Sequence, residues 1–189
     1  MTFLEIFKRT FATISSPTSA WEKLSTETGN TKKEDFSFFY TLLGVNVIAA
    51  FIGGLFYSNN FPFVAAILKA IIWGIALYGG FWGVYYVLVG ILFKRFHVSR
   101  NKTESIRLIF YSFALSLTIN ILTSLLPGMF FLKIILVYTL FIVWEGVGKM
   151  IPELDENEKS NFVLLLSGSI ILLPIIIYQF LILAVPAAR

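Results

Sequence analysis

Among the polar side chains inside long apolar segments of this sequence, five are the first candidates for chemistry. They are Lys69, Lys133, Glu145, Asn46 and Asn120. An ionisable group within a membrane-spanning helix is costly, so it is a functional candidate by default. Glu145 is the one acidic residue among them, and its carboxylate could serve as an acid, a base or part of a transport path. The alternative is an interfacial ion pair with Lys149, four residues further along the same helix.

The two lysines fall one or two turns from the end of their apolar segments, on the same predicted side. If Lys69 and Lys133 both point into the bundle, they form a cationic vestibule for an anion or an anionic lipid. If they point outward, their long side chains extend to the headgroups and anchor the helices. Asn46 and Asn120 leave a second choice open, between hydrogen bonds that join helices and a polar substrate path.

No catalytic, metal-binding or cofactor-binding motif accompanies these residues. The chain has no cysteine, and its single histidine, His97, has no carboxylate at a metal-ligand spacing. A P-loop, a GxSxG elbow, an HExxH motif and a paired-carboxylate arrangement are all missing from the sequence. We therefore expect a protein that is not an enzyme and needs no cofactor. A lipid-modifying enzyme with Glu145 as its acid or base is a further alternative.

The first 35 residues lack an apolar run long enough to span a membrane, but they show helical periodicity. Phe3, Phe7 and Phe11 recur at helical spacing, with Lys8 and Arg9 at positions between them. This pattern predicts an amphipathic helix that lies on the cytoplasmic surface of the membrane.

A second short helix is expected from Pro17, because proline fits the first turn of a helix, and Trp21 gives it an apolar anchor. The two helices form either a docking surface for a partner or lipid headgroups, or an anchor that packs on the bundle. Basic residues near the predicted membrane boundary extend this surface: Lys32, Lys33, Lys94, Arg95, Arg100 and Lys102. Each contributes about 1 kcal/mol of attraction near an anionic membrane.

These candidates are positioned by a chain too apolar for a soluble domain. Hydrophobic residues make up 57% of its 189 residues and charged residues 14%, whereas soluble domains average about 25% charged. A spanning helix needs about 20 mainly apolar residues, and five segments qualify: 36–57, 63–93, 105–126, 129–147 and 161–185. The sequence thus predicts an all-α polytopic membrane protein, with a cytoplasmic segment over residues 1–35 and a five-helix domain over 36–189.

The distribution of basic residues sets the predicted orientation. They concentrate in the N-terminal segment and in the second and fourth loops, which share one side, whereas the other side has only Arg189. By the positive-inside rule the N-terminus is cytoplasmic and the C-terminus lies outside, as expected in a bacterial inner membrane. The same rule accounts for the formal charge of +4 without a nucleic-acid partner.

The second apolar segment is longer than a bilayer requires. As a helix, residues 63–93 would extend about 46 Å, against a hydrocarbon core of about 30 Å. The segment is either one tilted helix or a helix broken at Gly79 and Gly80. A break would move the basic loop that follows to the outer side, so we expect one long helix.

Three further stretches carry a resemblance to a known family. The block Phe7–Glu27 contains Ser16-Pro17-Thr18-Ser19-Ala20-Trp21-Glu22-Lys23-Leu24. The second span ends in Gly83 and Gly90-Ile91-Leu92-Phe93, and the third opens with Ser105 and Phe110-Tyr111-Ser112-Phe113. Together with the number and order of the spans, these stretches resemble the bacterial branch of the Yip1 family. The resemblance implies a five-helix membrane domain with a cytoplasmic N-terminus. The Asp-Leu-Tyr-Gly-Pro motif of the eukaryotic members, which are associated with membrane traffic and small GTPases, has no counterpart here.

The sequence therefore favours a non-enzymatic module that organises the membrane or binds proteins or lipids. Its expected partners are anionic headgroups at the cytoplasmic face and a membrane protein or a second copy of the chain. The alternative is a small transporter or channel whose polar path uses Glu145, Lys69, Lys133, Asn46 and Asn120. A path of this kind requires these side chains to converge on one cavity.

Overall fold

Long helices lie side by side through most of the molecule. The computed structural model describes residues 1–27, 32–57, 62–99 and 102–185, and these ranges contain no β-strand. Within them, five helical stretches are long and apolar enough to cross a membrane: Lys32–Phe56, Phe63–Arg95, Lys102–Leu125, Pro127–Met150 and Glu156–Ala184. The predicted all-α, five-span architecture is therefore confirmed, and the chain is an integral membrane protein.

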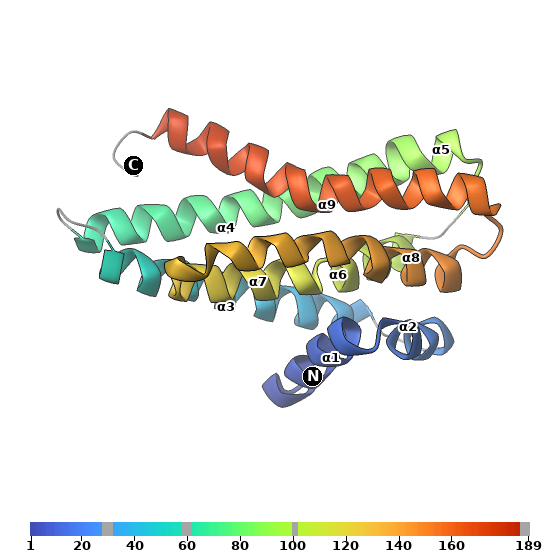
Figure 1. The fold of residues 1–189 in the computed structure, drawn as a ribbon, viewed down its shortest axis with the longest axis horizontal. Coiled ribbons are helices and arrows are strands. Elements are labelled where there is room, and N and C mark those ends of the chain that lie inside the picture. The colour runs from blue at the N-terminus through green and yellow to red at the C-terminus, as the bar shows by residue number, and fades with distance from the viewer. Residues whose placement is uncertain (28–31, 58–61, 100–101, 186–189) are drawn as a thin grey trace.

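Two of the spans are single α-helices and three are composite. The single helices are α3 (Lys32–Tyr57) and α9 (Glu156–Ala184). The second span joins α4 (Pro62–Tyr86), the π-helical η1 (Val87–Leu92) and α5 (Phe93–Arg95); the third joins α6 (Lys102–Ser112) and α7 (Ala114–Leu125); the fourth joins the 3₁₀ helix η2 (Pro127–Tyr138) and α8 (Thr139–Met150). The short helices α1 (Phe3–Ser15) and α2 (Pro17–Thr26) precede all of them (Figure 1).

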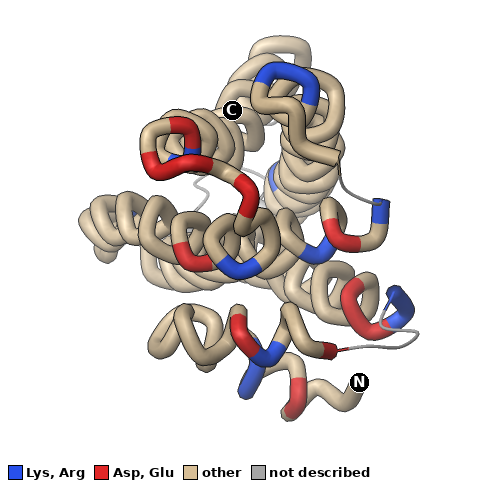
Figure 2. Tube along the Cα trace, turned by 90° about the vertical axis from the view of Figure 1, so that its right-hand side faces the viewer, with Lys and Arg blue, Asp and Glu red and all other residues tan. Residues whose placement is uncertain are grey.

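The two ends of the bundle differ in charge. One end carries α2 and the turns after α5 and α8; we call it the charged end, and Figure 2 views the molecule from this side. The opposite end is formed by the starts of α4 and η2 and the end of α9, and we call it the pocket end. At the pocket end the described residues provide two charged side chains, Lys69 and Lys133, and no carboxylate side chain.

The second span runs through Gly79 and Gly80 without a break, and its irregular part lies later, at η1. Its 33 residues exceed the roughly 20 that a bilayer requires. The span ends at the charged end with Lys94 and Arg95, whose side chains are exposed. The structure thus has one long helix here, as the loop charges suggest.

Aromatic side chains fill the core where α3, α4 and α6 meet. Phe39, Phe81 and Phe110 pack as a triplet with 4.7 Å between the ring centroids of each pair, and all three are buried. Such aromatic pairs each add about 0.5–1.5 kcal/mol beyond their burial. Every residue of α6 from Ser105 to Ser112 is buried, so α6 is the central helix of this region.

Figure 1 shows helix α9 bent along its length. We attribute the bend to Pro174, because a proline inside a helix removes a backbone hydrogen bond. Before the bend α9 packs on α8, and it also packs extensively on α4, but η2 forms no comparably extensive contact with it. Figure 1 shows the last part of α9 diverging from η2. Gly80 allows the close approach at the bend, since a Cβ atom there would lie 2.6 Å from Cγ of Pro174.

Small residues also let α3 approach its neighbours, as the small-xxx-small spacing of Ala49 with Gly53 and of Ala50 with Gly54 predicts. A Cβ atom on Gly53 would overlap the backbone oxygen of Ser124 in α7. One on Gly54 would lie 2.9 Å from the Cα atom of Ala66 in α4. These glycines therefore hold α3 against two helices of the same chain.

We predict that Gly53→Ala destabilises the protein while Gly44→Ala, in the same helix, does not. A methyl group at position 53 meets backbone that cannot rotate away, and such overpacking costs about 1–3 kcal/mol. At position 44 a Cβ atom meets nothing within 4 Å, and alanine favours the helix. Unfolding midpoints in detergent, followed by circular dichroism, measure the difference; equal midpoints for the two variants would contradict the prediction.

Candidate functional site

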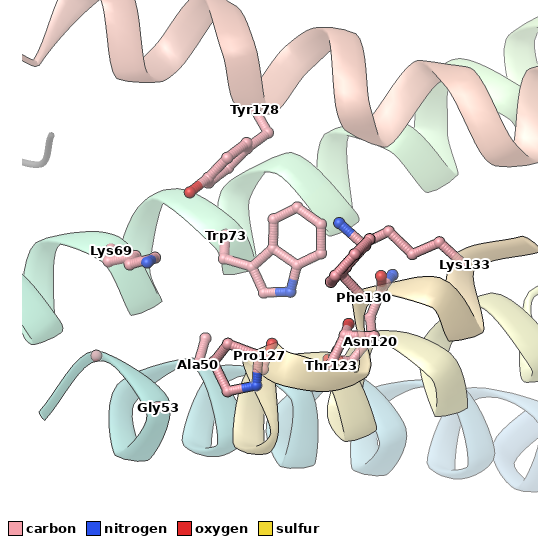
Figure 3. Close-up of a pocket in the computed structure, with 12 residues that line it drawn as sticks. Ala50, Gly53, Lys69, Trp73, Asn120, Thr123, Pro127, Phe130, Lys133 and Tyr178 are labelled. Carbon is pink, nitrogen blue, oxygen red and sulfur yellow. The ribbon is translucent and has the colours of Figure 1, made fainter. Parts of the chain in front are cut away.

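A pocket of about 300 Å³ lies at the pocket end. Its lining comes from five elements: Ala50, Gly53 and Gly54 of α3, Lys69 and Trp73 of α4, Asn120, Thr123 and Ser124 of α7, Phe130 and Lys133 of η2 with Pro127 at its start, and Tyr178 of α9. Three of the five polar residues predicted from the sequence, Lys69, Lys133 and Asn120, thus share one cavity. Figure 3 shows their side chains around the ring of Trp73.

Helical spacing and the bend in α9 position these side chains. Lys69 and Trp73 are one turn apart on α4 and lie on one face of that helix. Tyr178 lies one turn after Pro174, where α9 has diverged from η2. Its ring contacts Trp73 edge to face, with 4.9 Å between the ring centroids. The two lysines approach from opposite sides, Lys69 from α4 and Lys133 from η2 (Figure 3).

The indole N–H of Trp73 is buried and has no hydrogen-bond partner among the described residues. The lysine ammonium groups and the indole N–H are donors that cannot accept a hydrogen bond. The amide of Asn120 and the hydroxyl groups of Ser124 and Tyr178 can add further donors. The pocket therefore offers donors and positive charge, and none of its lining residues is acidic.

Glu145 lies away from this pocket, near the other end of the bundle. It borders a shallow groove between α8 and α9, together with Trp144 and Ser160. The described residues show no ion pair between Glu145 and Lys149, so the predicted helix-end pair is not formed. Lys159 lies instead 4.2 Å above the ring of Trp144. The described residues also contain no group of three or more His, Cys, Asp or Glu side chains that could hold a metal ion.

Asn46 is buried between α3 and α7 and does not line the pocket. Its amide nitrogen donates to the carbonyl oxygen of Leu42 at 2.9 Å and to that of Leu117 at 3.2 Å. The second bond joins the two helices, which is the structural role that the sequence left open for this residue. The five polar residues therefore do not converge on one path.

At the charged end a buried ion pair joins helices that are far apart in sequence. Nε of Arg107 in α6 donates to Oδ2 of Asp35 in α3 at 3.1 Å, and their side chains are 7% and 2% exposed. Nη1 of Arg107 also donates to the carbonyl oxygens of Leu24, at 2.8 Å, and Glu27, at 3.4 Å. These carbonyls belong to the end of α2, where a helix leaves acceptors unsatisfied. One guanidinium thus ties α2 and α3 to α6.

Two more residues extend this network to α1. The hydroxyl of Tyr111 donates to Oδ1 of Asp35 at 3.3 Å and accepts from Nη1 of Arg9 at 3.0 Å. Arg9 also forms an ion pair with Glu27 at 3.1 Å. Burial opposes the charge of Arg9, but Tyr111 and Glu27 outweigh it and raise the pKa of the guanidinium. The network therefore links α1, α2, α3 and α6.

Trp21 is fully buried beneath α8, so it is not the surface contact that the sequence suggested. Its indole N–H donates to the carbonyl oxygen of Ile142 at 2.9 Å. The ring lies against Gly146, where a Cβ atom would approach it to 2.7 Å. Trp21 thus packs α2 against the bundle. The prediction that Trp21 contacts lipid or a partner is wrong, because its side chain is buried.

Most of the other residues predicted to contact lipid or a partner have exposed side chains. Exposed side chains are those of Phe7, Lys8, Phe11, Lys32, Lys33, Lys94, Arg95 and Lys102, while Arg9 is partly buried. Arg100 lies outside the described residues. Lys32 and Lys102 also border a small hollow beside Asp35. The exposed lysines and Arg95 among them form a basic rim, and the binding of the predicted contacts to lipid or protein stays a prediction.

We predict that Asp35→Asn lowers the free energy of unfolding by about 3–5 kcal/mol, because Arg107 then loses its buried carboxylate partner. Glu34→Gln is the control, since that carboxylate pairs with Arg9 at 3.5 Å near the surface, where such pairs contribute about 0–1 kcal/mol. The double variant Asp35→Asn/Arg107→Gln should recover part of the loss. Chemical unfolding in detergent measures all three, and similar losses for the two single variants would refute the prediction.

Comparisons with known proteins add no assignment to this geometry. No family model matches the chain, no curated protein matches it, and no solved structure matches it. The resemblance to the Yip1 family stays a prediction from the sequence.

Proposed function

We propose that this protein is a non-enzymatic, membrane-organising module whose interaction surface is α1, held against the bundle and facing lipid at the cytoplasmic interface. The observation that carries the proposal is the apolar face of α1. Phe3, Leu4, Phe7 and Phe11 are each 62–66% exposed although the helix itself is docked. A docked helix that leaves four large apolar side chains uncovered has a second surface to bury.

The position of α1 beside the spans favours lipid as what covers this face. Helix α1 packs on α3 and α7, and α7 begins 12 residues after Lys102, the start of the third span. This is about 18 Å along the helix axis, so α1 lies alongside the span rather than beyond its end. In Figure 1 α1 lies beside the spans near the middle of their length, with its N-terminal end directed away from them. Its exposed apolar side chains are therefore at the level of the spans, where lipid is available to cover them.

The residues around the axis of α1 divide into three strips. Ile6, Thr10 and Thr13 are buried against the bundle. At 100° per residue, the exposed phenylalanines lie on one flank of this buried strip, while Glu5 and Lys8 lie toward the other flank. An interfacial helix needs such a division, with apolar side chains toward the acyl chains and charged ones toward water.

The N-terminus of α1 is fixed as a helix by a capping box. The backbone N–H of Thr2 donates to Oε2 of Glu5 at 2.7 Å, and the N–H of Glu5 donates to the hydroxyl of Thr2 at 3.4 Å. The bond from Thr2 lowers the pKa of the Glu5 carboxyl, which keeps the cap in place at neutral pH. Together with the Arg9 network, the cap supports a rigid surface rather than a loose tail.

The proposal keeps the orientation expected from the sequence, with the N-terminus in the cytoplasm of a bacterial inner membrane. The basic rim at the charged end supports this orientation through the positive-inside rule. It also keeps the resemblance to the bacterial branch of the Yip1 family. A transport path has less support, because Asn46 and Glu145 lie outside the pocket that holds the two lysines.

Single cysteine labels test the proposal directly, because the chain contains no cysteine of its own. We predict that an environment-sensitive fluorophore on Phe7→Cys is blue-shifted and strongly quenched by spin-labelled lipids in anionic liposomes. The control is Ala12→Cys, which is exposed on the charged flank of the same helix and should be quenched at most half as much. Weak quenching at both positions would place α1 in water or against another protein and would refute the proposal.

A further inference from the structure

We infer that the pocket at the pocket end is a binding site for a phosphate group. The group can belong to a lipid headgroup or to a small phosphate in solution, and both present the same tetrahedral oxyanion. The inference goes beyond the proposed function, since no residue of α1 lines the pocket and neither surface requires the other.

Charge is the first argument for an anionic occupant. Two ammonium groups, those of Lys69 and Lys133, border one cavity of about 300 Å³. Neither forms an ion pair with a described residue, and no lining residue is acidic. Like charges that face a common space repel each other, and an anion between them turns this repulsion into attraction. The pair is therefore an electrostatic site for negative charge.

The unsatisfied indole of Trp73 is the second argument. A buried donor without an acceptor costs about 1–3 kcal/mol, and the N–H of Trp73 has no acceptor among the described residues. An oxygen of the occupant can supply it. Figure 3 shows the indole nitrogen on the side of the ring that faces Asn120 and Pro127. The indole N–H thus orients a bound oxyanion, which the lysine ammonium groups alone would not do.

The number of donors favours phosphate over carboxylate. Trp73, Asn120, Ser124 and Tyr178 add neutral donors from three different helices to the two ammonium groups. Donors that converge from several directions match an oxyanion with three or more acceptor oxygens, whereas a carboxylate has two. The size is also suitable, because about 300 Å³ is the lower limit for small-molecule pockets. A phosphate with its nearest ester groups fits, and a large solute does not.

The pocket is lined by η2 on one side and by α9 on the other, through Phe130 and Tyr178. These two elements form no extensive contact with each other, since α9 packs mainly on α4 and η2 on α7. Phe130 lines the pocket and is 71% exposed, so the rim on this side is apolar. A lipid can place its phosphate between the lysines while its acyl chains contact this apolar rim. A soluble phosphate would bind the lysines and make no contact with the rim.

The test uses the full chain in a phosphate-free maltoside detergent, with binding measured by native mass spectrometry and by thermal shift. The probes are phosphatidylglycerol, diacylglycerol with the same acyl chains, inorganic phosphate and acetate. We expect phosphatidylglycerol to bind at least tenfold more tightly than diacylglycerol. If inorganic phosphate displaces phosphatidylglycerol, the pocket binds free anions. If inorganic phosphate does not displace it, the pocket is a lipid site. Failure of both phosphate probes to bind, or equal binding of diacylglycerol, would overturn the inference.

Variants place the binding in the pocket. Lys69→Gln/Lys133→Gln should weaken phosphatidylglycerol binding at least tenfold. The control Lys94→Gln/Arg95→Gln removes the same charge at the charged end and should change it less than twofold. Trp73→Phe retains an aromatic side chain and both lysines but removes the indole N–H, and a threefold to tenfold loss is expected. This variant also tests the inference if the lysine variant does not fold. Unchanged binding in Trp73→Phe together with equal losses in both double variants would show that the phosphate binds elsewhere.

Discussion

The buried ion pair between Asp35 and Arg107 determines how the N-terminal part of the chain is attached to the membrane domain. Taking two charges out of water costs several kcal/mol for each ion, so the pair is stable only when its remaining donors and acceptors are satisfied. The end of α2 and the hydroxyl of Tyr111 fulfil this condition. The packing of α2, and through it of α1, is thereby coupled to the most buried helix of the bundle.

The two ends of the bundle differ in how their charged side chains are paired. At the charged end, arginine side chains face carboxylates and carbonyl oxygens of the same chain, and the result is a rigid joint between helices. At the pocket end, two like charges face a cavity without an acidic neighbour among its lining residues. The first arrangement is complete within the chain, whereas the second gains most from a molecule that is not part of it. Stability and binding are therefore separated along the long axis.

The spans could be predicted from the sequence because apolar length is a property of each segment alone. Lys69 and Lys133 could be located for the same reason, but their direction depends on η2 and on the bend in α9. The burial of Arg107 could not be predicted, since nothing local in the sequence shows that Asp35, 72 positions earlier, faces it. Trp21 was misplaced because an exposed anchor and a core side chain have the same periodicity, and only the packing against α8 separates them.

The 3₁₀ geometry of η2 sets the reach of the fourth span. A 3₁₀ helix rises about 2.0 Å per residue and an α-helix 1.5 Å. The backbone of Met129 is not helical, so the regular part of η2 covers residues 130–138. These nine residues extend about 18 Å as a 3₁₀ helix and would extend about 13.5 Å as an α-helix. Rewinding them would shorten the span by about 4–5 Å and turn Lys133 about its axis. The length of this span and the direction in which Lys133 points thus change together. The thickness of the surrounding bilayer therefore influences both.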